Sequence, residues 1–423
     1  MSGDALPTGT VAQSPSLWRH RLFLRLWTGQ TISLIGSQVT LLALPLTAVL
    51  TLRASAFQMG VLRALQYAPA LLIGLFAGVY IDRLRRRPIL MGADVGRALL
   101  LGSIPLVAAL GALTMGYLDG IAFLVGSLSV IFEAAYLAFL PTLVGRGQLV
   151  DANGKLEASA SVSRIVGPGF AGLLIQLLTA PIAIIADAAS FVVSVVFLRL
   201  VRVDEPRPAP ARRGALWGEI GEGLRFVFGH PLLRATLISS GVTNFFSAIF
   251  NALFVLYAVR QLGLNAAGLG GIFLVGGVVG LCVAMLAGRF ARRVGLGPVM
   301  VIGMFLLASS GGIFVSVSGI GVVTIALLAL AEALSAAGDA LYNVTVASLR
   351  QSLTPDRLLG RVAASARFVI WGAQPFGALL GGVLGETIGL RPTLAIAVAG
   401  WFVAFLTLVT SPIRGLRSQP AAV

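Results

Sequence analysis

The sequence predicts an all-α membrane protein with twelve transmembrane helices arranged in two pseudo-symmetric halves of six. Of its 423 residues, 57% are hydrophobic and only 11% are charged, whereas a soluble protein carries roughly 25% charged residues. Apolar stretches of about 20 residues, the length that crosses a bilayer as a helix, recur along the whole chain. Basic residues gather between alternate stretches. A soluble protein is therefore excluded.

Charge-free runs and turn signals set the expected spans in order. Five runs, 26–52, 98–118, 235–259, 261–288 and 392–413, contain no charge and are each long enough alone. Two longer runs divide at Thr179-Ala180-Pro181 and at Ser318-Gly319-Ile320-Gly321. The predicted spans are 24–50, 57–81, 89–113, 119–144, 157–178, 181–201, 234–258, 266–288, 297–317, 321–348, 363–385 and 391–412.

The formal net charge of +15 predicts an orientation. If the N-terminus is inside, 24 of the 31 basic residues lie in cytoplasmic tails, loops and helix ends, and only Arg53, Arg260 and Arg391 lie outside. This asymmetry places both termini in the cytoplasm of a multi-pass cell-membrane protein. No basic stretch is long or aromatic enough to indicate nucleic-acid binding. The single cysteine, Cys282, excludes a disulfide framework or a cysteine metal site, and no cofactor is expected.

The longest connection divides the chain into residues 1–202, a cytoplasmic linker 203–233 and residues 234–423. The linker begins with a Pro- and Arg-rich segment. It then carries Leu216, Ile220, Leu224 and Val227 at helical spacing, which predicts a helix lying in the membrane interface.

An internal repeat supports the division into halves. A shift of 209 residues lays Gly172 over Gly381, and a shift of 210 lays Gly78 over Gly288. Chance alignment in a sequence rich in Leu and Gly is the alternative. Together with the central linker, the matches favour a duplicated six-helix unit.

The loop after the second span carries a motif that indicates a family. On charge alone, the Arg cluster of this loop predicts an anchor that binds the loop to anionic lipid headgroups. The motif resembles the G-x-x-x-D-R-x-G-R-R loop of the major facilitator superfamily, with Arg85 in place of the second Gly. The matching residues are Gly78, Asp82, Arg83, Arg86 and Arg87. The resemblance implies that Asp82 stabilises the outward-open state by holding the second span against the eleventh, near Arg361 and Arg367.

The fifth span carries a second motif, which resembles the G-P-x-x-G-G signature of antiporter-type members of that family. Its residues are Arg164, Gly167, Pro168, Gly169 and Gly172. Ordinary packing of small residues between helices is the alternative interpretation.

Longer stretches resemble the drug-exporter branch that includes macrolide and enterobactin exporters. They are 140–144, 151–153, 186–191 and 350–362, and the resemblance runs from about Trp18 to Ile413. It implies a monomeric secondary active transporter that exports a small amphipathic or hydrophobic compound, such as a drug, an antibiotic or a siderophore-like molecule. Protons would drive it by antiport with alternating access, and its partners would be the substrate, protons and membrane lipids.

Ionisable residues inside the spans are candidates for proton coupling because charge at the bilayer centre is costly. Glu133 and Glu332 fall near the midplane, in apolar surroundings that suit protonation and release. Asp94 and Arg97 share one helical face, where a local ion pair is favoured. Asp187 completes the set, and for Glu133 and Glu332 the alternative is a carboxylate held by a partner purely for packing. Asp187 with Arg63, and Asp339 with Arg367, are the expected pairs.

Uncharged polar residues mark a candidate substrate cavity between the halves. They are Gln38, Gln66, Asn244, Asn251 and Gln374. Asn244 and Asn251 lie seven apart among phenylalanines, which suits an amphipathic ligand. Hydrogen bonding between helices explains the same residues without a ligand.

The same sequence features can be compared with those of other classes of membrane protein. The chain contains no phosphate-binding G-x-x-x-x-G-K-[ST] loop and no nucleophile, base and metal cluster, so we expect no enzyme and no ATP-driven pump. An importer, or a transporter of another substrate class such as lysolipid, fits the same fold. A membrane-embedded lipid-acting enzyme or scramblase using Asp82 and Asp94 would not need the repeat.

Overall fold

The computed structural model describes residues 16–74, 84–203, 205, 216–319 and 321–417, and these residues form helices without a strand. The long helices are α1 (Arg21–Leu46), α2 (Ala56–Leu72), α4 (Arg86–Ala109), α5 (Met115–Val144), α6 (Leu149–Leu178), α7 (Ala180–Leu200), α8 (Leu216–Gly229), α9 (Pro231–Arg260), α10 (Ala266–Val294), α11 (Leu296–Ser316), α12 (Val322–Leu353), α13 (Leu359–Thr387) and α14 (Leu390–Val409). A π-helical turn over Thr47–Thr51 extends α1, and short 3₁₀ turns precede α1, α6 and α13 and follow α14.

The predicted membrane spans are confirmed wherever the structure describes them. Eleven of the described helices are long and apolar enough to cross a membrane. The remaining predicted span, 57–81, begins with α2, which runs from Ala56 to Leu72, and residues 75–81 of that span lie outside the described residues. Several helices extend beyond the predicted bounds. The largest difference is at α6, which begins at Leu149 rather than at 157, with an ion pair between Asp151 and Lys155 in its charged first turns.

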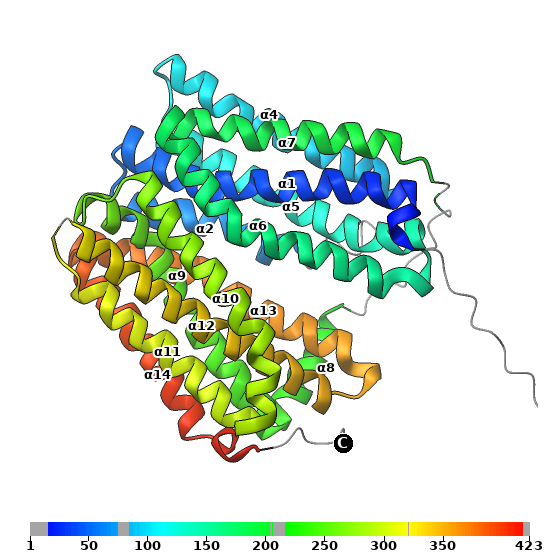
Figure 1. Ribbon diagram of the computed structural model, residues 1–423, viewed down its shortest axis with the longest axis vertical. Coiled ribbons are helices and arrows are strands. Elements are labelled where there is room, and N and C mark those ends of the chain that lie inside the picture. Colours follow the sequence, from blue (N-terminus) through cyan, green and yellow to red (C-terminus); the bar gives the residue numbers. More distant parts are fainter. Residues whose placement is uncertain (1–15, 75–83, 204, 206–215, 320, 418–423) are drawn as a thin grey trace, which may run out of the picture.

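Two groups of helices make up the molecule. The first half contains α1, α2 and α4 to α7, and the second half contains α9 to α14, with packing dominated by pairs such as α1 with α7 and α11 with α12. We call the end formed by loops 52–55, 110–114, 261–265 and 388–389 the distal end. The opposite, basic end carries Arg21, Arg86, Arg87, Arg292 and Arg293. Figure 1 shows the two halves meeting at the distal end and spreading apart toward the basic end.

Two glycine-to-glycine crossings join the halves near the distal end. A Cβ on Gly60 of α2 would lie 2.6 Å from Cα of Gly382 on α13, and a Cβ on Gly172 of α6 would lie 2.9 Å from Cα of Gly270 on α10. Such distances leave no room for a side chain, so the helix backbones themselves touch. Gly60 and Gly270 are 210 positions apart, as are Gly172 and Gly382. The internal repeat is therefore visible as equivalent packing.

This equivalence corrects one of the alignments made from the sequence. The 209-residue shift laid Gly172 over Gly381, but Gly381 packs on Ile249 within its own half, at 3.0 Å from a Cβ position to the Ile249 Cα. Because Gly381 and Gly382 are adjacent, the shifts of 209 and 210 residues are hard to distinguish by sequence. The contact with Gly60 shows that Gly382 is the equivalent of Gly172.

Polar contacts reinforce the distal junction. The Arg260 Nη2 at the end of α9 donates to the Ala54 carbonyl at 2.8 Å, and the Phe57 N–H in the first turn of α2 donates to the Glu386 Oε2 at 3.1 Å. Both hydrogen bonds cross between the halves.

The linker helix forms as predicted and rests on the second half. Helix α8 packs on α13 and α9, with Val227 buried and Glu222 paired with Arg361. Arg361, the residue expected near Asp82, therefore contacts α8. Gly78, Asp82 and Arg83 lie outside the described residues.

We predict that Gly270→Val blocks closure of the distal end, because the new side chain would overlap the backbone of Gly172 and Pro168. A Cβ on the adjacent Gly271 meets nothing within 4 Å, so Gly271→Val is the matched control. Distances between spin labels at Arg53 and Ile388, in a Cys282→Ser background, should lengthen in Gly270→Val and stay at the wild-type value in Gly271→Val. An unchanged distance in both variants would show that the crossing does not control closure.

Candidate functional site

A cavity of about 800 Å³ lies between the two halves. Helices α1, α2 and α6 of the first half and α9 to α12 and α14 of the second supply its walls. The glycine crossings lie within about six residues of the helix ends at the distal side, and they close that side by direct backbone contact. Toward the basic end the helices of the two halves spread apart (Figure 1).

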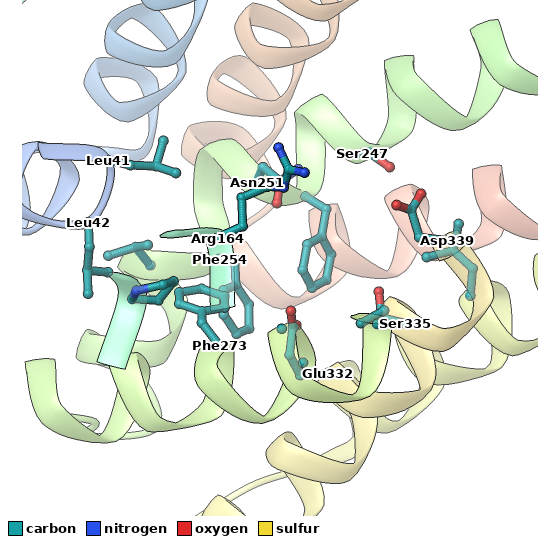
Figure 2. Close-up of a pocket in the computed structure, with 18 of the residues that line it drawn as sticks. Leu41, Leu42, Arg164, Ser247, Asn251, Phe254, Phe273, Glu332, Ser335 and Asp339 are labelled. Carbon is teal, nitrogen blue, oxygen red and sulfur yellow. The ribbon is translucent and has the colours of Figure 1, made fainter. Parts of the chain in front are cut away.

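Two polar stripes with the same spacing line the second-half wall. Asn244, Ser247 and Asn251 follow one another on α9, and Glu332, Ser335 and Asp339 do so on α12. Positions separated by three and seven residues share one helical face. Figure 2 shows the three α12 side chains along one wall, with Ser247 and Asn251 of α9 nearby.

Four of the five predicted cavity residues line this space: Gln38, Gln66, Asn244 and Asn251. Gln374 is the exception, because its amide nitrogen donates to the Asn244 Oδ1 at 3.3 Å from outside the lining. The structure brings these residues together, and their role in binding stays a prediction.

Aromatic rings from α9, α11 and α14 also line the cavity. The Phe250 ring lies 5.2 Å from that of Phe254, 5.2 Å from that of Phe314 and 5.0 Å from that of Trp401, centroid to centroid. The Trp401 indole donates to the Ser247 Oγ at 2.9 Å, which fixes its orientation. The site thus combines an apolar wall with a few oriented polar groups, the composition typical of small-molecule sites.

Glu332 and Asp339 are the carboxylates of the cavity wall. Glu332 fits there because Gly276 on α10 has no side chain; a Cβ at Gly276 would lie 2.6 Å from the Glu332 Cγ. Among the described residues neither carboxylate forms an ion pair. The predicted pair of Asp339 with Arg367 is wrong, since the Arg367 guanidinium lies over the Trp371 ring at 5.9 Å.

A second charged cluster lies in the core of the first half, away from the cavity. Asp94 and Arg97 form the predicted ion pair, and their exposed fractions are 0% and 6%. The Arg97 guanidinium lies 4.4 Å from the centroid of Phe132 and 4.1 Å from that of Phe191. This arrangement buries a cation between two rings and beside one carboxylate.

Asp187 belongs to the same buried cluster and not to the predicted pair with Arg63. Its Oδ1 accepts hydrogen bonds from Ser37 at 3.3 Å and Ser190 at 3.2 Å, and it interacts electrostatically with Arg97. Sequence gives the depth of a residue but not the direction in which it faces, and α7 turns Asp187 toward α1 and α4.

The structure corrects the expectation that Glu133 is buried. Phe132 and Ala135 form the buried face of α5 at this level, and Glu133 points to the exposed face. It does not line the cavity. Near-midplane depth and small neighbours suggested burial, but they do not fix the angular position around the helix.

The predicted antiporter-type segment lies at a three-helix junction. Gly167 abuts Gln38 of α1, Gly169 abuts Leu274 of α10 at 3.2 Å from a Cβ position, and Pro168 lines the cavity. Gly172 makes the distal crossing already described. The segment is therefore a helix contact that also borders the cavity.

The described arginines of the loop motif bind the start of α4 to the end of α7. The backbone N–H groups of Arg86 and Arg87 donate to the Glu205 carboxylate at 2.6 and 2.9 Å. The Arg87 Nε donates to the Leu198 carbonyl at 2.9 Å. These contacts lie within the first half, and Arg164 of the other motif pairs with Glu157 at 2.5 Å on its own helix.

Several cavity residues were missed by the sequence analysis. They are Ser161, Ser247, Ser335, Phe273, Phe314 and Trp401. The repeated spacing of three and seven on α9 and α12 is a signal that could have found both Ser247 and Ser335. The aromatic residues carry no comparable signal in so apolar a sequence.

Comparison with known proteins supports a family assignment. The sequence model of the Major Facilitator Superfamily matches residues 26–378. An uncharacterized MFS-type transporter YfiS of Bacillus subtilis is 26% identical over 94% of each chain. The multidrug efflux pump Tap of Mycolicibacterium fortuitum is 28% identical over 85% of this chain and 88% of that protein. Macrolide efflux protein A of Streptococcus pyogenes is 24% identical over 90% and 95%.

Solved structures confirm the fold. The nucleoside transporter NupG superposes with a TM-score of 0.73, covering 92% of this chain and 98% of that one at 14% identity. At this identity the likeness concerns the arrangement of helices alone.

We predict that Arg97→Gln destabilises the protein far more than the loss of an exposed cation. Removing Arg97 leaves Asp94 and Asp187 buried without a cation, which costs about 3–5 kcal/mol in comparable cases. The control is Lys155→Gln, which breaks the pair with the exposed Asp151 carboxylate and costs about 1 kcal/mol or less. Thermal unfolding in detergent compares the two variants. Equal shifts of the unfolding midpoint would show that the cluster is not a stabilising element.

Proposed function

The chain belongs to the Major Facilitator Superfamily, and on that premise we propose that it exports a small amphipathic or hydrophobic compound in exchange for protons. The observation that carries the proposal is the cavity between the halves, which is closed at the distal end and combines an aromatic wall with two carboxylates that form no ion pair among the described residues. Substrate and proton can both reach such a wall.

Relatives support the direction of transport and the substrate class. Tap of Mycolicibacterium fortuitum is a multidrug efflux pump, and the Streptococcus pyogenes relative is a macrolide efflux protein. Both align with this chain over most of their length. We infer that this chain likewise moves drug-like compounds outward.

The charge distribution supports the membrane orientation. The basic end carries the arginines of the α4 start and the α10 end, and basic residues prefer the cytoplasmic side. We therefore propose that the basic end and both termini are cytoplasmic, so that the described conformation faces inward. A compound would enter the cavity from the cytoplasm or from the inner leaflet.

Alternating access would follow from the two-half architecture. Residues 1–202 and 234–423 would rock about the cavity as a monomer, connected by the linker 203–233 with α8 at the cytoplasmic interface. Outward opening requires the distal crossings and the Arg260 and Glu386 hydrogen bonds to separate. Asp82 and the neighbouring arginines would then hold the basic end closed.

Glu332 is the proposed proton carrier. Its side chain lies in the cavity against Gly276, and Asp339 is the titratable group that interacts with it electrostatically. A proton neutralises the carboxylate while the site is closed, and exposure to the opposite side allows release. The buried Asp94, Arg97 and Asp187 cluster lacks this access and would act as a structural support.

We predict export in everted membrane vesicles that contain the protein. A proton gradient directed outward from the vesicle lumen should drive ethidium, a fluorescent amphipathic cation, into the lumen, because antiport exchanges the two. Dye fluorescence reports accumulation, and vesicles without the protein provide the background. Accumulation that survives a protonophore or requires ATP would contradict proton antiport, and accumulation only in right-side-out vesicles would indicate import.

We further predict that Glu332→Gln abolishes gradient-driven accumulation in the same vesicles, because the amide cannot carry a proton. Glu133→Gln is the matched control, since Glu133 is exposed and does not line the cavity. Immunoblotting checks that both variants reach the membrane in equal amounts. Wild-type accumulation in Glu332→Gln would move the coupling role to another group.

A further inference from the structure

The charges on the cavity wall are divided between the two halves. Arg63 of α2 and Arg164 of α6 supply positive charge from the first half, and Glu332 and Asp339 of α12 supply negative charge from the second. Among the described residues no ion pair crosses the cavity between these groups. The cavity is therefore polarised from one half to the other.

The two arginines are not equivalent. Arg164 already pairs with Glu157 at 2.5 Å and also donates to the Ser161 Oγ at 3.1 Å, so its charge is compensated on its own helix. Arg63 donates to the Gln66 Oε1 at 3.2 Å and lies 4.9 Å from the Tyr67 ring centroid. These partners are neutral. Arg63 is thus the wall cation whose charge no described carboxylate balances.

The uncompensated charges lie at different distances along their helices from the distal end. Arg63 follows the distal start of α2 by seven positions, about 10 Å along the helix axis. Glu332 and Asp339 follow the distal start of α12 by ten and seventeen positions, about 15 and 26 Å. Phe250, Phe254 and the neighbouring rings line the wall of the same cavity. A ligand reaching both charges needs an apolar body between its polar ends.

We infer that the substrate is a zwitterionic amphiphile, with a basic group toward Glu332 and Asp339 and an acidic group toward Arg63, separated by an aromatic or apolar body. This inference rests on the proposed function and specifies its substrate class. A charge held in a cavity within the membrane is costly unless it is paired. A lipophilic cation satisfies only the α12 side, whereas a zwitterion satisfies both sides and leaves the complex closer to neutral.

The test is equilibrium binding to the full chain in lipid nanodiscs without any gradient. The probes share one aromatic body: ciprofloxacin, which carries a basic amine and a carboxylate at opposite ends, its methyl ester, which keeps only the amine, and its N-acetyl derivative, which keeps only the carboxylate. Titration calorimetry at neutral pH should give a Kd for ciprofloxacin at least about tenfold lower than for either derivative, an ordinary gain for one good charge pair.

Substitutions test which residues produce the preference for the zwitterion over its two derivatives. Arg63→Gln should raise the Kd of ciprofloxacin to that of the ester while leaving ester binding unchanged, and Arg63→Lys should keep the preference for the zwitterion. Glu332→Gln combined with Asp339→Asn should weaken ciprofloxacin and the ester together. Arg53→Gln, an exposed arginine of a distal loop, is the control and should change none of the three constants.

The outcomes separate this inference from the proposed function. Equal wild-type binding of ciprofloxacin and its ester, loss of the preference in Arg63→Lys, or no binding of any probe at millimolar concentration overturns the zwitterion inference. Proton-driven export can persist in each of those cases. Conversely, clear discrimination without gradient-driven accumulation in vesicles would overturn the exporter proposal and leave the substrate class standing.

Discussion

The backbone contact between the two halves is the constraint on which the described conformation depends. At Gly60 with Gly382, and at Gly172 with Gly270, the absence of side chains lets two helices touch at the distal end. Without a hydrophobic driving force inside the bilayer, close van der Waals packing is a principal source of helix association. These contacts, in turn, close the distal side of the cavity between the halves. The glycines thus determine where the halves meet and on which side the cavity is closed.

The same contact shows which features of the fold could be predicted from the sequence. Span positions followed from apolar length, and they are confirmed for eleven helices because the bilayer imposes that length on any sequence. The repeat was detectable, but its register was one residue off at Gly381, since neighbouring glycines are interchangeable in an alignment and not in a crossing. Local pairs such as Asp94 with Arg97 were also predictable, because helical geometry alone brings positions three apart together.

Predictions that depended on how a helix is rotated about its own axis were right for some residues and wrong for others. Glu133 and Glu332 have similar depth and similar apolar neighbours, yet α5 turns Glu133 to its exposed face and α12 turns Glu332 into the cavity. The deciding factor for Glu332 is Gly276 on another helix, which is 56 positions away in sequence. The predicted pair of Asp187 with Arg63 was wrong because it also required the rotation of a helix. Asp187 lies instead with Ser37, Ser190 and Arg97. Contacts between helices distant in sequence set these directions, and one sequence contains no record of them.

Comparison of the two charged clusters supports the proposal that only the cavity cluster takes part in transport. In the first-half cluster, Arg97 is held by Asp94 and by two aromatic rings, and the side chains are almost fully buried. The cluster is enclosed within the first half and does not line the cavity, so a change in protonation there would disturb packing without changing contact with a ligand. In the cavity, the opposite charges come from different halves and no described ion pair joins them. Their energy therefore depends on what enters the space between them and on how far apart the halves stand. Under the proposed mechanism, a wall whose opposite charges come from different halves would link ligand, proton and conformation, which a cluster buried within one half cannot do.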